Sequence, residues 1–143
     1  MSGSARPVLT AVIVAALVGD ATLTTLLGGA KVWVNVPDNT HHPYLWVVGG
    51  REVPIEPTFA RKSRRLVQVL VTAVSSQRGT AEVDSLTSRV IDVMAPDGTP
   101  GPAVTGFNDV WEFVENREPK QMEDQVDGAV VWMGTAVFNV PLL

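Results

Sequence analysis

Residues 66–74, Leu-Val-Gln-Val-Leu-Val-Thr-Ala-Val, carry the strongest strand signal in the chain. Successive side chains of a strand point to opposite faces of a sheet, and β-branched residues favour this conformation. One face of this stretch would be wholly apolar, with Val67, Val69, Val71 and Ala73. Gln68 and Thr72 mark the opposite face as wetter. The pattern predicts a central strand with one face in the core.

Four further segments are predicted to be strands from their β-rich or alternating sequences. They are residues 31–36, 43–48, 107–114 and 130–140. The pair Gly49-Gly50 is expected to end the second of them, and prolines to keep residues 51–65 in a mobile basic loop. Residues 115–127 are charged and weakly patterned, which favours a polar connection.

Two amphipathic helices are predicted. The first runs from Pro7, which suits a first helical turn, to Leu27, where a glycine pair offers a left-handed stop. Its expected buried stripe is Leu9, Val12, Ala16, Leu23 and Leu26. The second begins near the N-cap residue Thr80 and ends at Pro96. Its expected stripe is Val83, Leu86, Val90 and Val93 or Met94.

This order of elements indicates the α+β class. We expect a small, mostly antiparallel sheet of four to five strands with two helices packed on one face. The close spacing of the first two and of the last two strands favours antiparallel pairs. A chain of 143 residues with 45% hydrophobic content suits a single domain spanning residues 1–143.

Composition excludes several classes of function. The 15 acidic and 11 basic residues give a net charge of -4, which disfavours wrapping of DNA. The absence of cysteine excludes disulfides, thiolate zinc sites and cysteine nucleophiles. Asp20 and nearby threonines interrupt the apolar run that starts at Val8, so no membrane span is expected. A secretory signal peptide is the less favoured reading of that run.

Motifs for chemistry are sparse. The adjacent His41 and His42 have no clear third ligand, so no metal site is predicted. No phosphate loop, dinucleotide-binding glycine pattern or nucleophile elbow is present. The carboxylates of residues 112–124 are interpreted as a solvated face rather than an acid/base pair. We therefore predict no catalytic residue, no cofactor and a role that is not enzymatic.

The basic cluster Arg61, Lys62, Arg64 and Arg65 could bind phosphates or an acidic protein. The acidic charge of the whole chain favours a protein partner. A merely solvated loop is the alternative, and the residues alone leave both open. The residues predicted to contact partner proteins are Arg61, Lys62, Arg64, Arg65, Glu118, Lys120, Glu123 and Asp124.

The arrangement resembles the tail-completion proteins of long-tailed bacteriophages, which are also described as tail-terminator or head-to-tail joining proteins. The matching features are Ala16-Leu17, Asp20, Leu23, Leu26 to Gly29, Val32-Trp33, Val36-Pro37, Pro43-Tyr44 and the strand Val67 to Val74 that leads through Gly79 to a helix at Glu82. The resemblance is best over residues 11–50 and 65–95. The sequence departs from the family pattern at residues 96–102 and 115–127.

The resemblance implies a structural virion protein at the head-proximal end of the tail, assembled in the host cytoplasm. It implies a homo-oligomeric ring, commonly a hexamer, that binds the tail tube protein, stops tube growth and joins the tail to the head connector or neck protein. DNA would only pass through the lumen, and no membrane contact is expected. The alternatives are another phage head-tail connector, a generic oligomeric binding domain and a small secreted enzyme.

Overall fold

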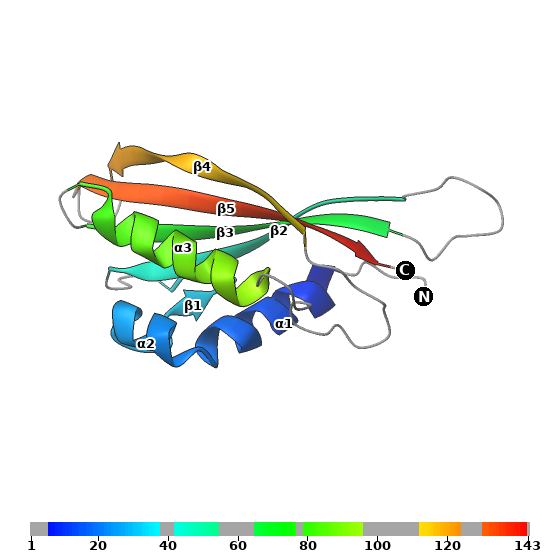
Figure 1. The fold of residues 1–143 in the computed structure, drawn as a ribbon, viewed down its shortest axis with the longest axis horizontal. Coiled ribbons are helices and arrows are strands. Elements are labelled where there is room, and N and C mark those ends of the chain that lie inside the picture. Colours follow the sequence, from blue (N-terminus) through cyan, green and yellow to red (C-terminus); the bar gives the residue numbers. More distant parts are fainter. Residues whose placement is uncertain are drawn as a thin grey trace.

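The computed structural model describes residues 6–37, 42–54, 65–76, 79–95, 112–123 and 130–142. They form a five-stranded sheet in the order β1-β2-β3-β5-β4, with helices along one face (Figure 1). The helices are α1 (Arg6–Val18), α2 (Ala21–Leu27) and α3 (Ala81–Met94). The strands are β1 (Val32–Trp33), β2 (Tyr44–Pro54), β3 (Arg65–Ser75), β4 (Glu112–Glu123) and β5 (Val130–Leu142). The predicted α+β fold with a mostly antiparallel sheet is confirmed.

The predicted central strand lies in the middle of the sheet as β3, between β2 and β5. Its apolar face is buried against the helices, as expected from the alternation of its side chains. The register continues this face across the sheet, because Val71 pairs with Val47 on one side and with Ala136 on the other. The buried core therefore lies between one face of β2, β3 and β5 and the helix layer.

The N-terminal helical segment is two helices, and the expectation of one continuous helix was wrong. The chain bends by 81° between α1 and α2. Asp20 causes the restart, because its carboxylate accepts a hydrogen bond from the Leu23 N–H at 3.0 Å and caps α2. The bend changes the buried stripe to Leu9, Ile13, Leu17, Leu23 and Leu27. The predicted Val12 and Ala16 are only partly buried, and Leu26 is exposed.

The end of α2 follows the prediction. Gly28 adopts φ 75° in the left-handed region, and the Gly29 N–H donates to the Thr24 carbonyl at 2.9 Å. Glycine is favoured there because any Cβ is strained at this dihedral.

The strand β2 is longer than predicted, because the pair Gly49-Gly50 does not end it. The strand continues to Pro54, with a register shift between Gly49 and Glu52 where the two strands lose their one-to-one pairing. A Cβ on Gly50 would lie 3.0 Å from the Gln68 carbonyl oxygen, so the backbones approach closely here. The glycines therefore permit a bulge within a strand rather than a turn after it.

The pairing of β1 with β2 is parallel, and the expected antiparallel pair was wrong. Parallel strands require the chain to return to the same end of the sheet between them. Because β1 has only two residues, little length is needed for that return. The last two strands, β4 and β5, are antiparallel as predicted.

Residues 115–123 belong to strand β4, so the prediction of a polar connection there was wrong. An edge strand with both faces partly in water can carry charges at successive positions, so it shows no period-two signal. Residues 107–111 of the predicted strand, and residues 124–127, lie outside the described part of the chain.

Candidate interaction surfaces

The described residues contain no group of three or more His, Cys, Asp or Glu side chains placed to hold a metal ion. No single helix among them is long and apolar enough to cross a membrane; the bent pair α1 and α2 passes that test only in length and composition. Three surfaces of the described residues differ clearly in chemistry: the edge strand β4, the sheet face opposite the helices, and the outer side of α1 and α2.

The β4 edge is charged and exposed. Glu118 and Lys120, two of the residues predicted to contact partners, lie on this strand and are exposed. The Arg117 guanidinium donates to the Glu115 carboxylate across 3.2 Å. Pro119 lies within a register shift between Arg117 and Lys120. Charges, proline and bulges are the usual means by which an edge strand avoids pairing with another chain.

The structure does not bring the predicted contact residues together into one described cluster. Arg61, Lys62, Arg64 and Asp124 lie outside the described residues. Arg65 begins β3 and Glu123 ends β4, and their side chains are not among those described. The basic cluster therefore stays a prediction.

No helix among the described residues packs on the opposite sheet face. At its centre the hydroxyl oxygens of Thr72 and Thr135 are 3.0 Å apart, within hydrogen-bond distance across β3 and β5. Trp46 on β2 remains 38% exposed on this face, although Val74 and Val137 are buried. Met122 on β4 is 51% exposed at the other edge of this face, since its register partner Val131 points to the same side as Thr135.

A hollow of about 320 Å³ lies beside Trp46, and we call it the Trp46 hollow. The Trp46 indole Nε1 donates to the Val34 carbonyl oxygen at 3.1 Å, which ties β2 to the segment after β1. The lining residues are Val34, Asn35, Val36, Tyr44 and Trp46. None of these side chains is ionisable near neutral pH, so the hollow suits an apolar or neutral polar group.

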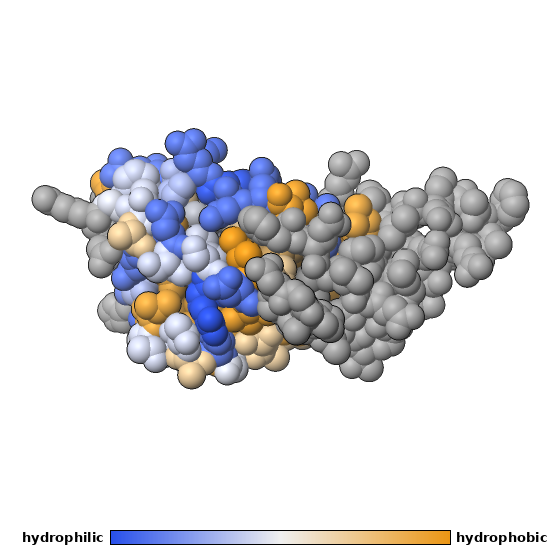
Figure 2. Space-filling view, viewed as in Figure 1, coloured by the Kyte–Doolittle hydropathy of each residue, from blue (hydrophilic) through white to orange (hydrophobic). Residues whose placement is uncertain are grey.

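From Pro7 to the end of α2, the outer side of the two helices carries no unpaired charged side chain. Between Pro7 and Ala30 the chain has one ionisable side chain, Asp20. Figure 2 shows mostly pale to orange residues over these helices and hydrophilic ones over β4. We call this area the uncharged helix surface; its exposed residues are Pro7, Ala11, Ala15, Gly19, Ala21, Thr22, Thr25 and Leu26. An exposed surface without charge is a candidate for burial by another protein.

Asp20 is neutralised by Arg89, which extends from α3. Arg89 Nε donates to one carboxylate oxygen at 2.9 Å and Nη2 to the other at 2.7 Å. The hydrogen bond from Arg89 lowers the pKa of Asp20, and the N–H of Leu23 adds to this effect. The same hydrogen bond raises the pKa of Arg89. This two-pronged pair fixes the junction of α1 and α2 on α3.

The Asp20–Arg89 pair was missed by sequence analysis, because its members are 69 positions apart and each has an ordinary local role. Asp20 interrupts an apolar run, and Arg89 sits in an amphipathic helix. The one available signal was that Asp20 is the only charge in an apolar segment, which requires either exposure or a partner.

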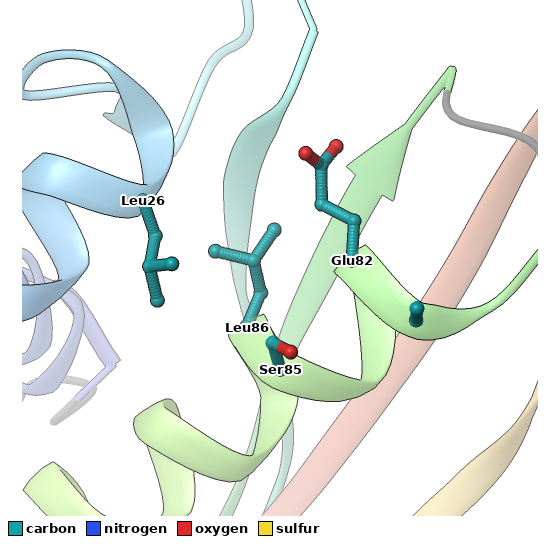
Figure 3. A pocket seen from close by; sticks show the side chains of 5 residues that line it. Leu26, Glu82, Ser85 and Leu86 are labelled. Atoms are coloured by element: carbon teal, nitrogen blue, oxygen red, sulfur yellow. The ribbon is translucent and has the colours of Figure 1, made fainter.

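Leu26 projects between two shallow hollows on the helix side. One hollow, of about 200 Å³, is lined by Leu26, Ala81, Glu82, Ser85 and Leu86. Figure 3 shows Leu26 of α2 facing Leu86 of α3, with the Glu82 carboxylate at the rim. The second hollow lies on the other side of Leu26, against Ala21, Thr22 and Thr25. Leu26 is 43% exposed and forms a shared apolar wall of the two hollows.

Comparisons with known proteins identify a family. The family model described as tail completion protein gp17 matches residues 11–133. Among solved structures, a chain of the virion of a native gene transfer agent particle is similar, with a TM-score of 0.70. The two chains are 17% identical, and the similarity covers 99% of this chain and 98% of that one. At this identity the likeness shows a shared fold. A comparison with curated protein sequences finds no significant match.

Proposed function

Because the chain belongs to the tail completion protein gp17 family, we propose that it forms a ring on the end of the phage tail tube. The family establishes a structural tail protein of a virion. In the proposed role, the ring stops tube polymerisation and joins the tail to the head connector at the head-proximal end. A hexamer is the proposed ring size. The observation that carries the proposal is a family match that spans most of the chain.

The surfaces described above support self-association. A ring built by rotation needs two different patches on each subunit, one for each neighbour. The uncharged helix surface and the Trp46 hollow are two such patches, on opposite sides of the sheet. The charged β4 edge is available for solvent or for partners of opposite charge. One small domain thus carries surfaces of contrasting chemistry.

Removal of the protein from an otherwise complete particle tests the function. Without a terminator the tube has no stop signal, so we expect overlong tails that lack heads, counted by electron microscopy. Wild-type protein supplied in trans is the control and should restore both length and head attachment. Tails of normal length without the protein would refute termination. Normal head attachment without it would refute joining, so the two parts of the role are measured separately.

The basic cluster is proposed to dock on the tube or connector. Replacing Arg61, Lys62, Arg64 and Arg65 by serine is expected to leave the fold intact and to weaken tail capping. A control variant replaces Asp84 and Asp92 by serine, because both are exposed on α3 and neither is among the predicted contact residues. Undiminished capping by the first variant would remove the basic cluster from the proposed function.

A further inference from the structure

We draw no further inference here: the strongest candidate, the uncharged hollow beside Trp46 on the sheet face opposite the helices, carries none because nothing among the described residues shows what covers it.

Discussion

Gly134→Ala probes the closest approach between the sheet and the helix layer. Gly134 lies on β5 beneath α3, and its backbone needs no unusual dihedral. A Cβ built there would lie 2.3 Å from Val83 Cγ1 and 3.3 Å from Thr87 Cγ2. Both helix residues are buried, so neither side chain can turn into solvent. The glycine is therefore required by packing, and its replacement should separate α3 from the sheet.

The magnitude follows from the size of the overlap. Carbon atoms pack best at about 3.5–4.0 Å, so α3 would have to retreat by more than about 1 Å. Rotation of Val83 is restricted because valine in a helix has one strongly preferred rotamer. Overpacking of this kind costs about 1–3 kcal/mol in free energy of unfolding. In a domain of this size the melting temperature should fall by about 3–9 °C.

Urea unfolding followed by circular dichroism measures this loss. The matched second variant is Val83→Ala, which removes the methyl group in contact. Val83→Ala alone leaves a small cavity, but in the Gly134→Ala background the new methyl group occupies that space. The double variant should therefore be more stable than the sum of the two single effects by about 1 kcal/mol or more. An unchanged stability of Gly134→Ala, or strictly additive effects, would refute the reasoning.

Three further predictions concern the pair that fixes the helix layer, the end of α2 and the core. Because the hydrogen bond from Arg89 lowers the folded-state pKa of Asp20, its stabilisation is present above the unfolded pKa and lost as pH falls through the folded one. The difference in unfolding free energy between wild type and Asp20→Asn should thus be constant from pH 7 to about 5 and shrink below about pH 4; a difference that does not change with pH would count against the pair. Gly28→Ala should cost about 1 kcal/mol in thermal unfolding, because Gly28 has φ 75°, and no loss would contradict this conformation. Phe138→Ala should cost about 3–5 kcal/mol, because Phe138 is fully buried at 0% exposure, and a loss below about 1 kcal/mol would show that the core repacks.

The sequence best predicts those elements in which one face is buried along the whole length. The alternation in β3 and the helical period in α3 each place apolar residues at regular intervals, so the pattern itself records the position of the core. The buried stripe of α3 contains Val83, Leu86 and Val90, as expected. The stop at Gly28 was predictable because its signal is local.

The elements that sequence missed depend on partners distant in the chain. The junction at Asp20 is held on α3 by Arg89, and no local rule joins two residues on different helices. The strand identity of residues 115–123 comes from pairing with β5, whereas their charges suit any exposed segment. The continuation of β2 beyond Gly49 depends on β3 as its neighbour. Tertiary pairing overrode the local preference in each case.

The exposure of the candidate contact residues was predictable only in part for the same reason. Charge was used as the signal for contact, and it selected Glu118 and Lys120, which the structure places on an exposed edge. The uncharged helix surface has no such signal, since alanines and threonines are ordinary residues on a helix. Only the fold shows which of these alanines and threonines face outward and together form an exposed surface without charge.

The two edges of the sheet then limit how copies of this chain can meet. Pairing of β4 with β4 of another copy is disfavoured, because the strand contains Pro119, a register shift and several charged residues. At the other edge, β1 contributes only two residues and offers a short template. In the proposed ring, contacts between copies are therefore expected to come from side-chain packing between faces rather than from strand pairing.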